Sequence, residues 1–314
     1  MMLGNRALPR DFYSQMIILK TMVVSAAYLL LSIFLVGFKI DQLVLLLIFN
    51  GFFYFSARTR KFVIGFSIFI IYWIIFDYMK AFPNYRYEKV SIAELYCLEK
   101  DLFGINLDGK IFTLNEFWQT KHVPTLDVLT GLFYLMWVPV PLFFAGYLYF
   151  KDKLQFIQFS LAFLWVNLIG FFIYYLYPAA PPWYVQIHGF KFLPQIPGNT
   201  AGLSRFDNFF GIELFKNLYS KGSNVFAAMP SLHSAYPVVV LYYGMKNRLG
   251  RINIFFLLVM LGIWFSAVYN SHHYVLDVIA GALCAALALI TFTIALKTKS
   301  FHRFIEYLLV QIRS

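Results

Sequence analysis

Two histidines and an aspartate stand at the beginnings of apolar segments. His233 lies in the run Pro-Ser-Leu-His-Ser, and His273 and Asp277 lie in the run His-His-Tyr-Val-Leu-Asp. One apolar segment separates these runs, so the chain returns between them and both enter their helices from the same side. Histidine exchanges protons near neutral pH and can also act as a nucleophile. We therefore expect the three residues to form one catalytic site.

The spacing of the second run favours chemistry on phosphate. His273 and Asp277 are four residues apart, on one face of a helix. The carboxylate can hold the imidazole in one tautomer and leave its other nitrogen free to react. Each helix N-terminus also offers free N–H groups and a partial positive charge, which suit a phosphate group. The arrangement predicts phosphoryl transfer, and the neighbouring Ser234 and His272 are candidate substrate-binding residues.

Other interpretations of these residues stay open. Histidines in apolar segments can be core residues with satisfied ring nitrogens, although ionisable groups in membrane segments are mostly functional. The three histidines of the two runs and Asp277 could also bind zinc, but no HExxH motif or cysteine ligand accompanies them. A transporter or channel would carry polar residues along several spans, whereas here they gather at the span entrances. We therefore predict an enzyme site without a metal or cofactor.

The composition is typical of a membrane protein. Hydrophobic residues make up 61% of the 314 residues and charged residues only 13%, against about 25% charged residues in soluble domains. The apolar residues form runs long enough to cross a bilayer as helices. We predict an all-α, polytopic membrane helix bundle. The net charge of +11 comes from short basic clusters between the apolar runs, which suits membrane topology, and we predict no nucleic-acid partner.

The apolar runs predict about eight membrane spans, within a range of six to eight. The second run is the weakest because it is short and contains Asn50 and Gly51. It either pairs with the first span as a hairpin or only dips into the bilayer. The predicted spans are 16–37, 42–57, 62–81, 127–150, 154–177, 231–246, 252–270 and 273–296.

The positions of the basic residues predict the orientation of the spans. If the N-terminus, with Arg6 and Arg10, is cytoplasmic, then each later basic cluster between spans is cytoplasmic too, as the positive-inside rule requires. The long loops 82–126 and 178–230 then lie on the opposite face, together with the catalytic histidines. We expect a bacterial inner membrane with a periplasmic active site, and a Golgi membrane stays open as the alternative.

We predict three parts along the chain. Residues 1–125 hold the first spans and the first long loop, residues 126–298 form the catalytic membrane core, and residues 299–314 form an amphipathic helix on the cytoplasmic membrane surface. Apolar residues recur at helical spacing in this tail: Phe301, Phe304, Ile305, Leu308, Leu309 and Ile312.

The two catalytic runs resemble a known superfamily. Pro-Ser-Leu-His-Ser, followed about forty residues later by His-x-x-x-Asp, is similar to the second and third signature motifs of the type 2 phosphatidic acid phosphatases. The resemblance implies that His273 is a nucleophile that forms a phosphohistidine, that Asp277 orients it, and that His233 protonates the leaving alcohol. Pro230 and Ser231 would then belong to the phosphate cradle.

A third segment narrows the resemblance to the inositol phosphorylceramide synthase branch. The run Ala-Pro-Pro-Trp-Tyr, which contains Pro182, Trp183 and Tyr184, accompanies the two catalytic runs. The branch implies transfer of phosphoinositol from phosphatidylinositol, or its phosphate, to ceramide, with release of diacylglycerol. Trp183 and Tyr184 would shield the phosphoenzyme from water, or would be a simple interfacial anchor. Whether a partner subunit takes part stays open.

Two departures from the superfamily pattern bear on the substrate. The first signature motif, a lysine six residues before Arg-Pro, is absent, and Ser266 and Ala267 stand where the third motif has Ser-Arg. The loss of two cations suits a singly charged phosphodiester better than a phosphomonoester. If Arg205, Lys216 or Lys221 replaces them, that argument fails, and a lipid phosphatase or polyprenyl pyrophosphate phosphatase is the alternative function.

Overall fold

The computed structural model describes residues 14–220, 222 and 224–313. The chain divides into two compact units, Met1–Ala81 with His302–Ser314 and Phe82–Phe301. Arg6 and Arg10, from which the predicted orientation starts, lie outside the described residues. The predicted domain boundaries and the predicted orientation in the membrane stay predictions.

The first unit consists mainly of three apolar helices, to which a short helical turn and part of the last helix are added. Helix α1 begins after Ser14, whose side chain accepts a hydrogen bond from the Ile17 N–H at 3.4 Å, and Ser56 caps α3 in the same way through the N–H of Thr59. Such caps satisfy N–H groups that a helix leaves without a partner. The helices are α1 (Gln15–Val36), α2 (Ile40–Phe55), α3 (Ala57–Tyr78), the short η2 (Met79–Ala81), and the final part of α15 (Lys299–Ile312).

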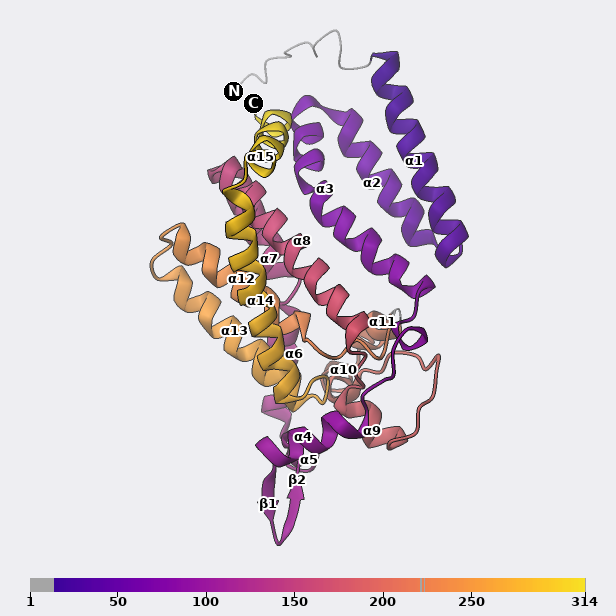
Figure 1. Cartoon of the computed structure of the whole chain (residues 1–314), viewed down its shortest axis with the longest axis vertical. Coiled ribbons are helices and arrows are strands. Elements are labelled where there is room, and N and C mark those ends of the chain that lie inside the picture. Colours follow the sequence, from indigo (N-terminus) through magenta and orange to yellow (C-terminus); the bar gives the residue numbers. More distant parts are fainter. Residues whose placement is uncertain (1–13, 221, 223, 314) are drawn as a thin grey trace. The chain divides into compact units, whose positions relative to one another are not determined.

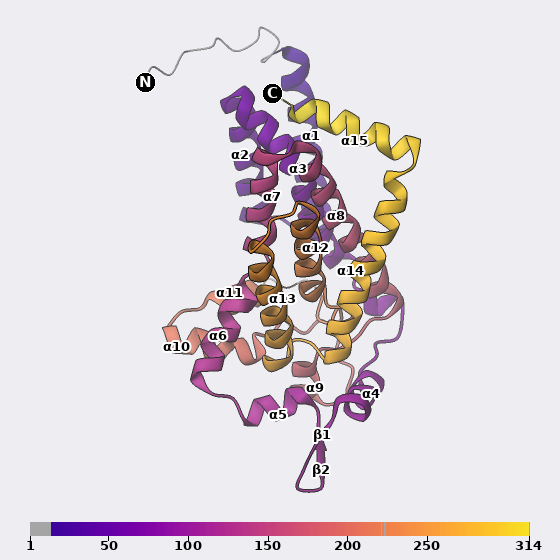
Figure 2. The same cartoon turned by 90° about the vertical axis from the view of Figure 1, so that its left-hand side faces the viewer.

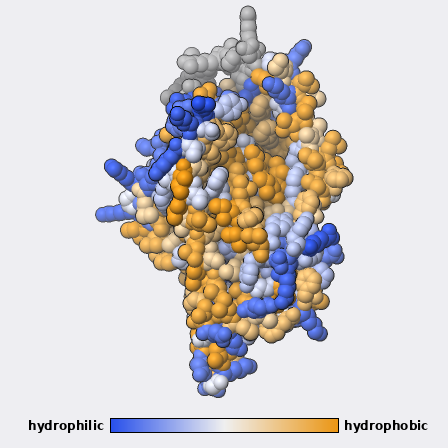
Figure 3. Space-filling model, in the orientation of Figure 1, coloured by the Kyte–Doolittle hydropathy of each residue, from blue (hydrophilic) through white to orange (hydrophobic). Residues whose placement is uncertain are grey.

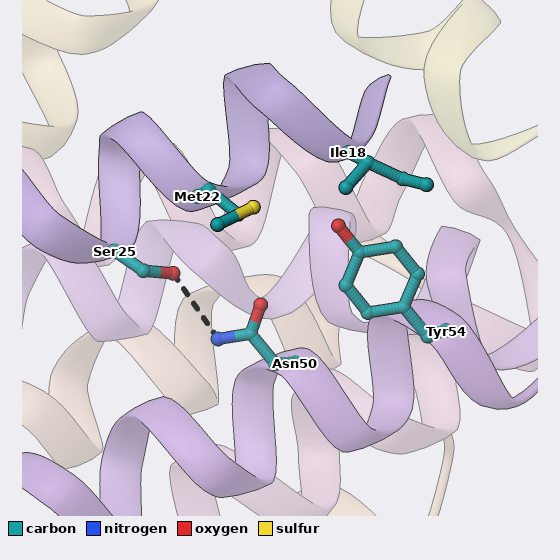
Figure 4. Close-up of a pocket in the computed structure, with 5 residues that line it drawn as sticks. All are labelled: Ile18, Met22, Ser25, Asn50 and Tyr54. Atoms are coloured by element: carbon teal, nitrogen blue, oxygen red, sulfur yellow. Dashed lines mark hydrogen bonds between the residues drawn. The ribbon is translucent and has the colours of Figure 1, made fainter. Parts of the chain in front are cut away.

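Asn50, which makes the second predicted span weak, has its polar side chain satisfied inside this unit. Its amide donates to the Ser25 hydroxyl of α1 at 3.1 Å and to the Leu46 carbonyl at 2.9 Å. Figure 4 shows these two side chains facing each other across a pocket of about 500 Å³, which Ile18, Met22 and Tyr54 complete. The hydrogen bond joins α1 to α2, as expected for the hairpin, which is one of the two alternatives predicted for this run.

A bundle of helices forms the centre of the second unit (Figures 1 and 2). Within it, α12 packs against both α13 and α14, α8 packs against α7 and α14, and α6 packs against α13. The bundle helices are α6 (Pro124–Leu135), α7 (Pro139–Lys151), α8 (Lys153–Leu176), α12 (Leu232–Lys246), α13 (Ile252–Tyr269) and α14 (Val275–Leu296).

The two long predicted loops fold into short elements near one end of this bundle. The first loop forms η3 (Asn84–Arg86), α4 (Ala93–Phe103), the antiparallel strands β1 (Ile105–Leu107) and β2 (Lys110–Phe112), and α5 (Leu114–Thr120). The second loop forms α9 (Pro182–His188), η4 (Ala201–Leu203), α10 (Ser204–Phe210) and α11 (Leu214–Ser220). In both views α4, α5, α9 and the hairpin lie beyond the ends of α13 and α14 (Figures 1 and 2).

The predicted all-α membrane bundle is confirmed, with the small hairpin as its departure from pure helix. In the described residues, six helices are long and apolar enough to cross a membrane, so the chain is a multi-pass membrane protein. The remaining two predicted spans correspond to α2 and α12, which have only 16 and 15 residues. Apolar side chains are exposed on the long helices, such as Leu258 on α13 and Leu287 on α14, as a lipid-facing surface requires. Figure 3 shows polar side chains at the hairpin.

The crossing of α12 and α14 is unusually close because Gly281 has no side chain. A Cβ atom at Gly281 would lie 2.1 Å from the Ser231 carbonyl oxygen. The Ser231 N–H also donates to the Asp277 carbonyl at 2.9 Å. The start of α12 is therefore held directly against the first turns of α14.

We expect Gly281→Ala to push α14 away from the start of α12. Because the obstacle is backbone, the added methyl group should cost roughly 1–3 kcal/mol in unfolding free energy, and activity should fall more than stability. Thermal unfolding and an activity assay in detergent check this. Gly146→Ala on α7 is the matched control, since nothing lies within 4 Å of its Cβ position. Equal behaviour of the two variants would show that the crossing tolerates separation.

Candidate active site

The two predicted catalytic histidines meet in space. His233 lies in the first turn of α12, and His273 lies two residues before α14 begins. The His233 Nδ1 atom is 3.3 Å from the His273 Nε2 atom. Both rings thus present a nitrogen to the same small volume, although their positions in the sequence are 40 residues apart.

Asp277 lies behind His273, as the helical spacing predicts. Its carboxylate is fully buried, and its Oδ2 atom accepts the Tyr274 N–H at 2.8 Å and lies 3.5 Å from the His273 Nδ1 atom. This last distance is longer than an ordinary hydrogen bond. Catalytic hydrogen bonds are often long without substrate and shorten when it binds. The geometry therefore lets Asp277 hold the ring of His273 once the site is occupied.

Aromatic side chains that sequence reasoning missed enclose His233. The Tyr134 hydroxyl lies 3.3 Å from the His233 Nδ1 atom, and the Trp137 ring meets the His233 ring edge-on with centroids 4.6 Å apart. Tyr134 itself is fully buried. Nothing in the sequence separates these two residues from ordinary aromatic residues of an apolar span. They restrict the orientations that the His233 ring can adopt.

His272 has a structural environment that differs from that of its two neighbours in the site. Its ring stacks between Tyr134 and Tyr219, with centroids 5.4 and 4.5 Å away, and its Nε2 atom lies 2.9 Å from the Thr200 carbonyl oxygen. Burial lowers the pKa of His272 to about 3. The ring is therefore neutral, and its Nε2–H donates to Thr200.

Pro230, Ser231 and Ser234 form the entrance to α12. Ser231 is the N-cap residue, and its hydroxyl accepts hydrogen bonds from the Ser234 N–H at 3.3 Å and from the Ser234 hydroxyl at 3.0 Å. Pro230 is buried directly before this cap. In the described part of the chain, the N–H groups of Leu232 and His233 have no hydrogen-bond acceptor. This helix N-terminus can therefore receive an anion.

The N-terminus of α14 is not available in the same way. The Tyr274 N–H binds Asp277, and the Val275 and Leu276 N–H groups bind the carboxylate of Glu99 at 3.0 and 3.1 Å. The prediction that both helix N-termini offer free N–H groups is thus wrong for α14. The sequence could not reveal this, because Glu99 is 176 residues away from Val275.

Arg205 is one of the two predicted substrate-binding cations, and part of its guanidinium group is already paired with an acidic residue. Its Nε–H donates to the Asp127 Oδ1 atom at 2.6 Å, and Asp127 also accepts the Tyr269 hydroxyl at 2.8 Å and lies 3.2 Å from His122. The Nη2 atom of Arg205 is buried without a partner among the described residues. Arg205 therefore has free donors, but its charge is largely balanced by Asp127.

The other two basic candidates are Lys216 and Lys221. Lys216 pairs with Glu213 on an exposed surface of the second unit. Lys221 lies outside the described residues. Of these three cations, Arg205 is thus the one for which the structure describes a buried donor without a partner.

Pro182, Trp183 and Tyr184 begin helix α9 and are all buried. The Trp183 N–H donates to the Ser271 carbonyl at 3.0 Å, directly before the two histidines of the second catalytic run. The Tyr184 hydroxyl donates to the Lys191 carbonyl at 2.6 Å. Trp183 and Tyr184 thus form a buried wall beside the catalytic segment, which we define as residues 271–277. They pack in a cluster with Val90, Ile92 and Phe226.

No group of three or more His, Cys, Asp and Glu side chains is arranged to hold a metal ion within the part of the chain that the structure describes. Ser231 and the N-terminus of α12 adjoin His233 and can bind a phosphate.

The burial of His272 predicts how stability depends on pH. The folded chain binds fewer protons than the unfolded chain between about pH 3 and pH 6.5, so the unfolding free energy should fall as the pH drops through this range. The slope from one such group is at most ~1.4 kcal/mol per pH unit. Thermal unfolding at about pH 7.5 and about pH 5 should show a smaller loss in His272→Gln than in wild type. His302→Gln, at an exposed position, is the control, and an unchanged loss in His272→Gln would contradict the expectation.

Comparison with known proteins places this geometry in a family. The family model of the PAP2 superfamily matches residues 107–291. The phosphoinositol dihydroceramide synthase of Bacteroides thetaiotaomicron is 41% identical over 291 residues, which cover 92% of this chain and 95% of the relative.

Two fungal proteins are similar over a shorter region. The inositol phosphorylceramide synthase of Candida albicans is 29% identical over 62% of this chain and 40% of its own length. The inositol phosphorylceramide synthase catalytic subunit of Saccharomyces cerevisiae is 27% identical over 68% of this chain and 52% of its own length. No solved structure matches the chain. With a family match over more than half its length and a 41% identical relative along nearly all of it, the chain belongs to the inositol phosphorylceramide synthase family of the PAP2 superfamily.

Proposed function

We propose that this enzyme transfers a phosphoinositol headgroup from phosphatidylinositol to ceramide or dihydroceramide and releases diacylglycerol. The observation that carries the proposal is the pair of imidazole nitrogens, 3.3 Å apart at the mouth of two apolar helices. The 41% identical bacterial relative supports the choice of an inositol lipid as donor and a ceramide as acceptor.

In the first step, the Nε2 atom of His273 attacks the phosphorus of the donor lipid. The bond between phosphorus and the diacylglycerol oxygen breaks, and protonated His233 gives its proton to that oxygen. Asp277 stabilises the positive charge that develops on the His273 ring, because its carboxylate lies beside the Nδ1 atom. The product of this step is a phosphoinositol group bound covalently to His273.

In the second step, His233 acts as a base. It removes the proton from the primary hydroxyl of the ceramide, and the resulting oxygen attacks the phosphorus while the bond to His273 breaks. Both the leaving group and the acceptor are lipid alcohols, so one residue can serve as acid and then as base. Tyr134 keeps the His233 ring in place during both steps through its contact with the Nδ1 atom.

The charge of the site favours a phosphodiester donor. A phosphodiester carries one negative charge, whereas a phosphomonoester carries about −1.5 to −2. Arg205 is largely balanced by Asp127, and the N–H groups at the start of α12 add only a partial positive charge. Counted over the described residues, this modest positive potential suits the donor proposed here better than phosphatidic acid or a polyprenyl pyrophosphate.

Exclusion of water completes the proposal. A transferase must keep water from its covalent intermediate until the second lipid arrives. The buried wall of Pro182, Trp183 and Tyr184 stands directly behind the catalytic segment, and we assign it this role. We place the site on the periplasmic face of a bacterial inner membrane, in keeping with the basic clusters between spans and with the bacterial relative.

A transfer assay tests the proposed function. Detergent-solubilised enzyme receives phosphatidylinositol and a fluorescent ceramide, and the products are separated by chromatography. Wild type should form labelled inositol phosphorylceramide, and His273→Ala should form none, because it lacks the nucleophile. Release of phosphate from phosphatidic acid or a polyprenyl pyrophosphate, without any transfer product, would instead identify a hydrolase and contradict the argument from charge.

A further inference from the structure

A carboxylate from the first long loop is buried against the catalytic segment. Glu99, on α4, is fully buried, and its Oε1 and Oε2 atoms accept the N–H groups of Val275 and Leu276 at 3.0 and 3.1 Å. Val275 follows His273 by two residues. The reaction proposed for His233, His273 and Asp277 does not use Glu99. Yet Glu99 is among the most completely buried charged side chains of the second unit.

The two hydrogen bonds suit an ionised carboxylate. Both oxygens accept an N–H group, and an amide side chain of the same shape could offer only one acceptor. Burial raises the pKa of Glu99, and the nearby Asp277 raises it further, while the two backbone N–H groups offset only part of that rise. The positive end of α14 adds further stabilisation of the negative charge.

Asn115, on α5 of the same loop, also binds the backbone of the segment that carries His273. This residue is fully buried, and its amide donates to the Val268 carbonyl at 2.8 Å and to the His273 carbonyl at 2.9 Å. Glu99 and Asn115 together bind the backbone at His273, Val275 and Leu276. The short segment that carries His273 is thus bound by two residues more than 150 positions away in the sequence.

We propose that Glu99 and Asn115 are positioning residues that fix the backbone of the His273 segment, and so set the direction from which its Nε2 atom meets the substrate phosphorus. The proposal rests on the function proposed above for His273. It also makes loop 82–126 a part of the active site, where the sequence placed it outside the catalytic core.

The physical reason is the small tolerance of the attack. In-line transfer needs the nucleophile close to phosphorus and aligned with the leaving oxygen, and a misplacement of about 1 Å can cost about 100-fold in rate. His273 precedes the helix, so the regular hydrogen bonds of α14 do not hold its backbone. Its own N–H binds the Ala267 carbonyl, the Tyr274 N–H binds Asp277, and Asn115 and Glu99 add further restraints.

Glu99→Gln tests the proposal with little change of shape. The amide turns an N–H group towards a backbone N–H, which breaks one of the two hydrogen bonds. We expect kcat to fall about 10- to 100-fold, with the KM for the donor lipid changed less than about threefold, because the groups that bind phosphate stay in place. Asn115→Ala should behave in the same way. Asp101→Asn, at an exposed position of the same helix, is the matched control and should match wild type.

Each variant is also assessed by size-exclusion chromatography and thermal unfolding. A kcat within about twofold of wild type, or a rise in KM that accounts for the whole loss, would overturn the proposal. So would the absence of folded protein in both Glu99→Gln and Asn115→Ala, since the two residues would then only maintain the fold. Hydrolysis of phosphatidic acid is measured alongside transfer. A wild type that only hydrolyses would count against the proposed function, while the positioning role would still be read from kcat for that hydrolysis.

Discussion

The site depends on the close crossing of α12 and α14. Gly281 lets the Ser231 carbonyl approach α14, and the Ser231 N–H binds the Asp277 carbonyl at 2.9 Å. This contact brings the His233 and His273 rings to within 3.3 Å. Two imidazoles so close repel each other when both are protonated, so the pair does not carry two charges at once. A neutral ring is the form in which histidine can act as a nucleophile.

The remaining elements restrict this pair from several directions. Tyr134 and Trp137 limit the His233 ring, whereas Glu99 and Asn115 bind the backbone around His273. Glu99 and Asn115 both come from the long loop between the third and fourth predicted spans. In the sequence, this loop has the pattern of a simple connection between two spans. Buried polar side chains are costly unless they are hydrogen-bonded, so their backbone bonds both satisfy them and fix the catalytic segment. Folding of the loop and assembly of the site are therefore coupled.

Much of this arrangement could be predicted from the sequence. Membrane helices follow from apolar runs, and His233, His273 and Asp277 could be recognised because local spacing places them at helix entrances on one side. Contacts between distant segments left no local pattern. Glu99 looks like an ordinary acidic residue of an amphipathic helix, and Tyr134 looks like a core tyrosine. Helix α12 has only 15 residues. For a helix this short, hydropathy alone does not distinguish a membrane span from a buried helix of a soluble protein.

The central claim is that His273 carries the phosphoinositol group between two lipids. The most direct measurement is to incubate the enzyme with phosphatidylinositol without ceramide, quench it rapidly, and analyse its peptides by mass spectrometry under conditions that preserve phosphohistidine. The account predicts an inositol phosphate adduct on the peptide that contains His273, which disappears when ceramide is added before the quench. It also predicts that His233→Ala reduces the adduct, because the diacylglycerol oxygen then leaves without a proton. An adduct on His233, or transfer that proceeds at the normal rate with no adduct on any residue, would contradict it.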